Sequence, residues 1–257
     1  PAAYCGIGAF KPSTGAMPSN GVTPLAPVFD TVGFFGFAIE DAVAAYEATQ
    51  PAFLRYGAAP ASPQPAVLIF EDDHLSDASP EVLAALDRLA AALAGAGYDV
   101  ARTPSPVSFA LLFELQQLMM FYEIGRSLRT LESAPKGSVG TRILEAVAKG
   151  RTIPLAEYVG ARMEMDRLRV ALVQTLGDAA ALWPATPAPA PEGLSSTGNP
   201  SYIAPWTAIG GPIVSIPTGF TSEGLPMGCI LTGRPGSDAR MCGWARTIAP
   251  VARVAAH

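Results

Sequence analysis

The chain has 257 residues, of which 49% are hydrophobic, and its 17 lysines and arginines against 22 aspartates and glutamates give a net charge of −5. The apolar content suffices for a folded core, while the acidic balance and the lack of a long basic run argue against nucleic-acid binding. No apolar run reaches the roughly 18 residues that span a bilayer, and the first residues lack the layout of a signal peptide. We therefore expect a cytoplasmic protein that does not contact membranes.

Residues that often carry hydrolase chemistry are scarce. The three cysteines, Cys5, Cys229 and Cys242, are odd in number and match no zinc-ligand spacing, which predicts reduced thiols in the core. Only two histidines occur, and His257 is the last residue, so a Ser-His or Cys-His mechanism would depend on His74 alone. These counts disfavour most hydrolases that use a histidine base.

The first 65 residues are predicted to contain little regular structure. Residues 1–36 are rich in glycine and have prolines at positions 12, 18, 24 and 27, which forbid a long helix and favour a buried platform of turns beneath an active site. A short helix is expected from Ala42 to Ala48. The Pro- and Ala-rich run at 58–65 predicts an extended connector, which need not mark a domain boundary.

A strand, a helix and a second strand are expected between residues 66 and 101. Residues 66–70 form a continuous apolar run, which is typical of a strand that is covered on both faces. Ser79 and Pro80 supply the cap and the first-turn proline of a helix that glycines end near position 95. A second strand follows at 98–101, and this βαβ order predicts a parallel pair.

Helices dominate the middle of the chain, and strands return near its end. The expected helices are 109–131, 141–148 and 154–176, followed by a strand at 179–183, a short helix at 202–209, strands at 212–216 and 227–231, and a helix from 237 to about 248. This alternation predicts a single α/β domain over residues 1–257, with a mixed β-sheet sandwiched between helices.

Two short motifs imitate catalytic patterns. Gly6 and Gly8 begin a dinucleotide-loop spacing, but the third glycine position is Lys11, which favours a tight structural turn. Ser133 and Lys136 have the Ser-x-x-Lys spacing of a lysine-activated serine. That motif opens a helix, and a proline here precedes the lysine, so we interpret the segment as a surface loop.

An acidic cluster follows the first expected strand. Residues 71–73 are Glu-Asp-Asp, and His74 and Asp77 lie just beyond them. Open α/β sheets often bind ligands at this position, and a divalent metal could use two of the carboxylates. Acidic residues before a helix are also ordinary partners of the helix dipole, which is the interpretation that we favour.

Both ends of the chain carry longer motifs in a recognisable order. At the beginning these are Pro1-Ala-Ala-Tyr-Cys-Gly6, Lys11-Pro12 and Gly21-Val-Thr-Pro-Leu-Ala26 followed by Asp30; near the end they are Trp206-Thr-Ala-Ile-Gly-Gly-Pro212, Ser215-Ile-Pro-Thr-Gly219 and the run from Gly224 to Arg234. The pattern resembles the amidase signature family, with the small-acid amidases of the malonamidase kind closest in appearance. Residues 100–175 match the family only in helix layout.

The resemblance implies a chemistry that needs no histidine, metal or organic cofactor. A serine attacks the amide, and a second serine in a cis peptide passes protons to a lysine that burial keeps neutral. The resemblance places all three groups before Pro1, so this chain is expected to be the C-terminal part of an amidase domain, to hold no catalytic residue and to be inactive alone. Lys11 corresponds to a structural lysine of the family.

The resemblance also implies that the chain supplies walls of the substrate pocket. The residues expected to contact substrate are Tyr4 and Cys5 behind the nucleophile, Trp206, Thr207 and Ile209 on the acyl side, and Met120 and Tyr122, with Met119, as a cap. Together they predict a small, largely apolar acyl site. For each single residue, packing in the core is the alternative interpretation.

The expected function is hydrolysis of a carbon–nitrogen bond in a small amide through a serine acyl-enzyme. The N-terminal half of the same enzyme, or a partner chain, would supply the triad, and a homodimer is possible. One alternative is the amidase subunit of an aminoacyl-tRNA amidotransferase, although the loop at 195–205 holds Asn199 and no carboxylate. A non-catalytic remnant that only binds small molecules or another chain is the other alternative.

Overall fold

The computed structural model describes residues 1–50 and 64–256. Most of the connector predicted at 58–65 lies outside the described residues. Within them, no helix combines the length and the apolar composition that crossing a membrane requires.

A seven-stranded sheet forms the centre of the described part of the chain, with the strand order β2-β1-β6-β7-β5-β3-β4. The strands are β1 Gly8–Lys11, β2 Phe34–Gly36, β3 Val67–Glu71, β4 Val100–Pro104, β5 Ala180–Pro184, β6 Ile213–Phe220 and β7 Pro226–Thr232. β3 runs parallel to both β4 and β5, and the remaining pairs are antiparallel. The predicted parallel pair and the predicted mixed sheet are therefore confirmed.

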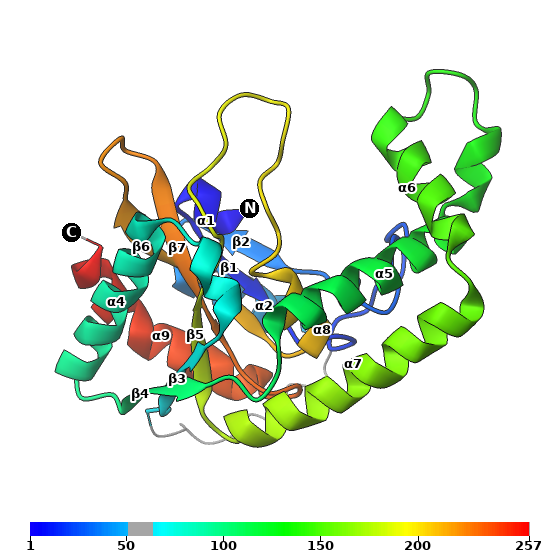
Figure 1. The fold of residues 1–257 in the computed structure, drawn as a ribbon. Helices are drawn as coiled ribbons and strands as arrows, with labels where there is room; N and C mark the ends of the chain where they lie inside the picture. The colour runs from blue at the N-terminus through cyan, green and yellow to red at the C-terminus, as the bar shows by residue number, and fades with distance from the viewer. Residues whose placement is uncertain (51–63, 257) are drawn as a thin grey trace.

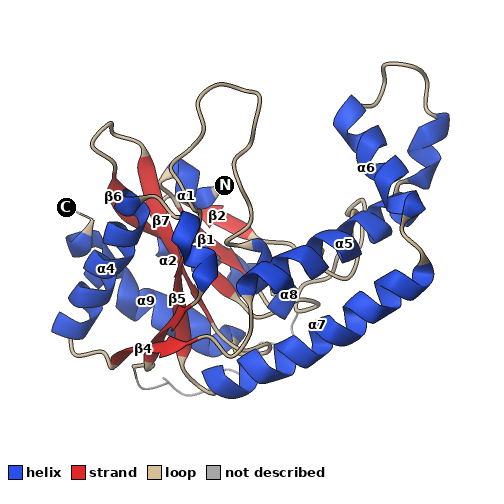
Figure 2. Ribbon diagram, in the orientation of Figure 1, coloured by secondary structure: helices blue, strands red, loops and turns tan. Residues whose placement is uncertain are grey.

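Helices lie on both sides of this sheet (Figure 1, Figure 2). They are α1 Ala2–Cys5, α2 Ile39–Thr49, α4 Pro80–Gly95, α5 Phe109–Ser127, α6 Thr141–Thr152, α7 Leu155–Leu176, α8 Ala204–Ile209 and α9 Asp238–Ala255, with short 3₁₀ helices at Asp73–Asp77 and Arg129–Ser133. Local sequence sets several starts, because the hydroxyls of Ser79 and Ser108 accept hydrogen bonds from the first turns of α4 and α5.

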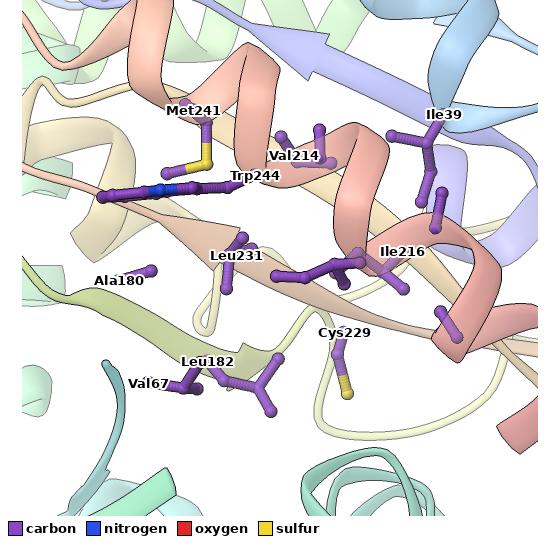
Figure 3. Close-up of a cluster of buried hydrophobic side chains, with 14 of the residues drawn as sticks. Ile39, Val67, Ala180, Leu182, Val214, Ile216, Cys229, Leu231, Met241 and Trp244 are labelled. Carbon is purple, nitrogen blue, oxygen red and sulfur yellow. The ribbon is translucent and has the colours of Figure 1, made fainter. Parts of the chain in front are cut away.

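The first core lies between the sheet and helices α2, α4 and α9. Met241 and Trp244 project from α9 over Val214 of β6 and Leu231 of β7 (Figure 3). Successive strand residues alternate between the two faces, so the residues next to these face the opposite side of the sheet.

The second core lies on that opposite face, against α5, α7 and α8. Its centre is aromatic: Phe109 stacks on Trp183 with the ring centroids 4.3 Å apart, and Trp206 lies 5.0 Å from Phe109. All three side chains are fully buried. The two cores together form the helix–sheet–helix sandwich that the alternating pattern predicts.

Strands β1 and β2 were not predicted from sequence, since residues 1–36 read as loop. They are short, and their glycines break the alternation on which strand prediction depends. Gly8 and Gly36 face each other across the pair. Adding a Cβ to Gly8 would bring it 2.6 Å from the backbone of Ala38, and a Cβ on Gly36 would come equally close to Asp41. These glycines are therefore required for α2 to pack against the two strands.

Candidate functional site

One row of residues crosses five strands of the sheet and leads from the second core into a cavity. The register aligns Trp183 with Ile230, Ile230 with Ser215, Ser215 with Ala9 and Ala9 with Phe35. Residues paired in this way point to the same face of a sheet. Trp183 is fully buried in the core, whereas the other four line the cavity.

The cavity has a volume of about 540 Å³, which lies within the usual range for a small-molecule site. Apart from the row just described, its walls come from α1, from further residues of β1 and β6, from the segment before and within β2, and from the loop between β5 and α8. These residues are Pro1, Ala2, Ala3 and Tyr4, Phe10 and Lys11, Thr31, Gly33 and Phe34, Ala185 and Thr186, Thr197, Gly198, Asn199, Pro200 and Ile203, and Ile213. Most of this surface is apolar, so the site suits a ligand with a small hydrocarbon group.

The loop between β5 and α8 forms one side of the cavity mouth. It rises beside the N-terminus in Figure 1, and its residues 197–200 line the cavity. Its exposed part is held by contacts that include the ring of Tyr4, which packs directly on Gly198, and the Arg142 guanidinium of α6, which donates a hydrogen bond to the carbonyl oxygen of Ser195. The loop is thus anchored to α6 at Ser195 and to α1 at Gly198.

Lys11 is the one cationic side chain among the described residues of the cavity wall. Its Nζ donates hydrogen bonds to the carbonyl oxygens of Pro12 and Gly211, each 2.8 Å away. Burial lowers the pKa of Lys11 from its ordinary 10.5 to about 8, and the charge of Asp238 opposes that shift. Lys11 therefore ties β1 to the segment before β6, in agreement with the structural role that the family resemblance implied.

The residues predicted to contact substrate separate into two groups. Tyr4 lines the cavity, and its contact with substrate stays a prediction. Cys5 ends α1 with an exposed side chain and does not belong to the cavity wall.

The other two cysteines, Cys229 and Cys242, are buried, and burial raises the pKa of each thiol to about 12. The prediction of core thiols therefore holds for these two and is wrong for Cys5, because the last residue of a single helical turn projects outward.

The residues expected on the acyl side lie in the second core. Trp206 is fully buried among aromatic rings, Ile209 is 3% exposed, and the Thr207 hydroxyl donates to the carbonyl oxygen of Ile203 within the same helix. The apolar face of a short helix that packs on a sheet becomes core, which explains the placement. Their contact with substrate stays a prediction.

The expected cap residues lie on α5, where α5 meets its neighbouring helices. Met119 is buried, and the thioether sulfur of Met120 accepts a hydrogen bond from the side-chain amide of Gln116. Tyr122 stacks on Tyr158 of α7 with the ring centroids 4.0 Å apart. These residues hold helices together in this structure, and a role of Met120 and Tyr122 as a cap over substrate stays a prediction.

The acidic cluster after β3 serves the fold. Asp72 accepts hydrogen bonds from the backbone of His74 and of Phe109, and Asp77 accepts one from the Tyr202 hydroxyl at 2.5 Å. Among the described residues no group of three histidine, cysteine or carboxylate side chains is placed to hold a metal ion. The cluster therefore fastens the end of β3 to α5 and to the segment before α8.

Cavity residues that sequence analysis did not predict to contact substrate include Ser215, Phe34 and Phe35. The alternation in β6 could have indicated that Ser215 faces opposite to Val214 and Ile216. Phe34 and Phe35 gave no such signal, because only the pairing of β2 with β1 shows which face of the sheet each one occupies.

The described fold is that of a mixed α/β domain with a cavity of small-molecule size beside its sheet. A family model described as Amidase matches residues 1–242, and the chain belongs to the amidase family. In sequence, it is 60% identical over 35 residues to Amidase 1 from Arabidopsis thaliana, which is 14% of this chain and 8% of that protein.

Solved structures show the same fold over nearly all of the chain. A crystal structure of an amidase matches with a TM-score of 0.80 and 25% identity over 96% of this chain. The peptide amidase from Stenotrophomonas maltophilia matches with a TM-score of 0.74 and 19% identity over 100% of it. This chain spans 59% of the first structure and 61% of the second.

Proposed function

We propose that this chain forms the acyl-binding part of a cytoplasmic serine amidase, which cleaves the carbon–nitrogen bond of a small amide through an acyl-enzyme and without a metal or organic cofactor. The observation that carries the proposal is the position of the cavity. Its wall begins with Pro1 and α1, the segment that the family resemblance places directly after the attacking serine. A cavity at that point would receive the acyl group of the substrate.

The attacking groups would come from residues outside this chain, either the N-terminal half of the same enzyme or a partner chain. Ser215 and Lys11 both line the cavity, but they are poor candidates for a nucleophile and its base. Lys11 lies on β1 opposite Ile213, not Ser215, and its ammonium group is already bonded to two backbone carbonyl oxygens. A general base must reach the hydroxyl proton that it removes.

The cavity wall supports a small, uncharged acyl group. The surface of the cavity is mostly apolar, and the Lys11 amine is hydrogen-bonded to two carbonyl oxygens. A substrate carboxylate would lose its water without gaining a free cation from this chain, which is costly in an apolar site. We therefore propose unbranched aliphatic or small aromatic primary amides as the substrate class.

Labelling with a fluorophosphonate probe tests the proposal on the intact gene product. The expected result is one modified serine outside residues 1–257, together with ammonia release from short aliphatic amides that labelling abolishes. The purified 257-residue chain is expected to be neither labelled nor active.

Three results would count against the proposal. A labelled serine within residues 1–257, with activity of this chain alone, would show that the chemistry lies here. An intact product that neither reacts with the probe nor releases ammonia would favour a non-catalytic binding module. An intact product that is active only with charged tRNA would favour the amidotransferase alternative.

A further inference from the structure

Ser215 of β6 is the one buried polar residue in the described part of the cavity wall. Its neighbours along the strand, Val214 and Ile216, point toward α9 in the first core (Figure 3). Successive strand residues face opposite sides of a sheet, so the Ser215 side chain points to the second face, where the cavity lies. No group of the described residues forms a hydrogen bond with its hydroxyl.

The surroundings of this hydroxyl are apolar. Ser215 pairs with Ile230 on one side and with Ala9 on the other, and Phe35 follows Ala9 in the same row. At about 4.8 Å between neighbouring strands, the row from Ile230 to Phe35 is roughly 14 Å long. The two small side chains in its middle therefore form a trough between two large ones, with the Ser215 hydroxyl on its floor.

The other polar side chains of the cavity wall are either bonded within the protein or lie at the mouth. Those that donate hydrogen bonds to backbone carbonyl oxygens are Lys11, Thr31 and Thr186. Those at the mouth, where α1 meets the exposed loop between β5 and α8, are Tyr4, Thr197 and Asn199. Within the described residues, Ser215 thus supplies the buried hydrogen-bonding group of the cavity that still lacks a protein partner.

A lone hydroxyl on an apolar floor discriminates between substrates. Water can bond to it in the free protein, but an acyl group that fills the trough expels that water. A pure hydrocarbon group then leaves the hydroxyl unsatisfied, which weakens binding, whereas a group with a neutral oxygen atom replaces the lost hydrogen bond.

We propose that Ser215 determines specificity by forming a hydrogen bond with a hydroxyl or keto oxygen in the acyl group of the substrate. This inference rests on the proposed function, because it assigns a feature of the substrate to the same cavity. Ser215 acts here as a binding residue and not as the nucleophile. The favoured substrates are straight-chain amides that carry one such oxygen and lie in the trough between Ile230 and Phe35.

A panel of paired amides tests this assignment on the intact gene product. Its members carry a hydroxyl or keto oxygen at each position of a short straight chain, and each is paired with the alkyl amide that has a methyl or methylene group there. Wild type should favour one oxygenated amide over its partner by about tenfold or more in kcat/KM. In Ser215→Ala this ratio should fall to about one, because both substrates then meet an apolar floor.

Thr218→Val is the matched control. It removes another buried hydroxyl of β6, one that lies outside the cavity wall, so its ratio should equal that of wild type. The melting temperature of Ser215→Ala should be no lower than that of wild type, because the Ser215 hydroxyl has no protein partner to lose.

The design separates failure of this inference from failure of the proposed function. If the intact product hydrolyses none of the amides, calorimetry measures the same ratio as dissociation constants, and a preference that depends on Ser215 would support the inference while the proposed hydrolysis fails. In either assay, the lack of any preferred oxygenated amide, or a preference that persists in Ser215→Ala, would overturn the inference. Hydrolysis of the alkyl amides would then still leave the proposed function standing.

Discussion

The ring of Tyr4 fills the space that a side chain at position 198 would need. A Cβ on Gly198 would lie 2.2 Å from Cε2 of Tyr4 and 2.6 Å from its hydroxyl oxygen. Gly198 also has a positive φ of 95°, which favours glycine. The loop between β5 and α8 therefore rests directly on α1 at the mouth of the cavity, through a contact between distant parts of the chain.

Replacing Gly198 by alanine should lift the loop away from α1. Gly193→Ala is a matched control, because Gly193 lies in the same loop with a φ of 76° and a Cβ there would meet nothing within 4 Å. In both variants the alanine is strained by the positive φ, but only Gly198→Ala also adds a clash with another side chain. Hydrogen exchange of residues 191–199 should accelerate more in Gly198→Ala than in Gly193→Ala, and Tyr4→Ala alone should also accelerate it, because it removes the contact. Equal exchange in the two glycine variants would show that the contact does not hold the loop.

Helices α5 and α6 cross so closely that glycine is required at the crossing point in both helices. A Cβ on Gly150 would lie 1.8 Å from the carbonyl oxygen of Phe121, and a Cβ on Gly125 would lie 2.6 Å from the backbone of Gly150. Arg126 reinforces the crossing by donating a hydrogen bond to the Gly150 carbonyl oxygen. The two backbones therefore touch at this point, and α6 cannot move closer.

Gly150→Ala should force the two helices apart and lower the free energy of unfolding by about 1–3 kcal/mol, the usual cost of overpacking. The control is Gly243→Ala, in the exposed part of α9, where a Cβ meets nothing within 4 Å. It should stabilise the chain by about 0.5–1 kcal/mol, since alanine favours a helix more than glycine does. Urea unfolding of the two variants measures the difference. A stable Gly150→Ala variant would mean that α6 can shift without loss.

Helices and strands could be predicted from sequence wherever the local pattern of residues is compatible with only one kind of secondary structure. The apolar run at 66–70, the capped helix at Pro80 and the hairpin strands near the C-terminus all formed within a few residues of their expected bounds. Pro250 did not end α9, which continues to Ala255. Its apolar face packs on the sheet through Ala249 and Ala252 on either side of the proline, so tertiary contacts outweigh the local signal.

The site was harder to predict, because strand register creates it. Ala9, Ser215 and Ile230 lie on three strands and face one cavity only because their positions align across the sheet. Sequence analysis found Tyr4 through a family motif but could not distinguish aromatic residues in a wall from aromatic residues in a core. Trp206 and Phe35 are both large and apolar, and only burial separates them: 0% against 60% exposure.

Substitutions at these two aromatic residues should therefore have opposite effects. Trp206→Ala should lower the free energy of unfolding by about 3–5 kcal/mol, because it empties a fully buried site between aromatic rings. Phe35→Ala should leave unfolding nearly unchanged and alter the relative turnover of short and aromatic amides by the intact enzyme, since Phe35 lines the cavity. A selectivity change in Trp206→Ala, with stability preserved, would instead place Trp206 at the acyl site.

The lowered pKa of Lys11 makes stability depend on pH in a defined window. Unfolded, the amine has its ordinary pKa of 10.5, whereas burial brings the folded value to about 8. Between these values the unfolded chain binds a proton that the folded chain has released, so stability rises as the pH is raised from 8 to 10.5. Below pH 8 both states are protonated, and the cost of burying the charge is constant.

Lys11→Met should remove this dependence. The difference in unfolding free energy between wild type and the variant should shift in favour of wild type by at most about 3 kcal/mol as the pH rises from 8 to 10.5. The raised pKa values of Cys229 and Cys242 act in the opposite direction, but both thiols are present in each protein and cancel. The lost hydrogen bonds to Pro12 and Gly211 add only a constant offset. Urea unfolding at several pH values measures the difference, with exposed Lys136→Met as the control that should stay flat. Parallel curves for wild type and Lys11→Met would mean that the amine keeps its ordinary pKa in the fold.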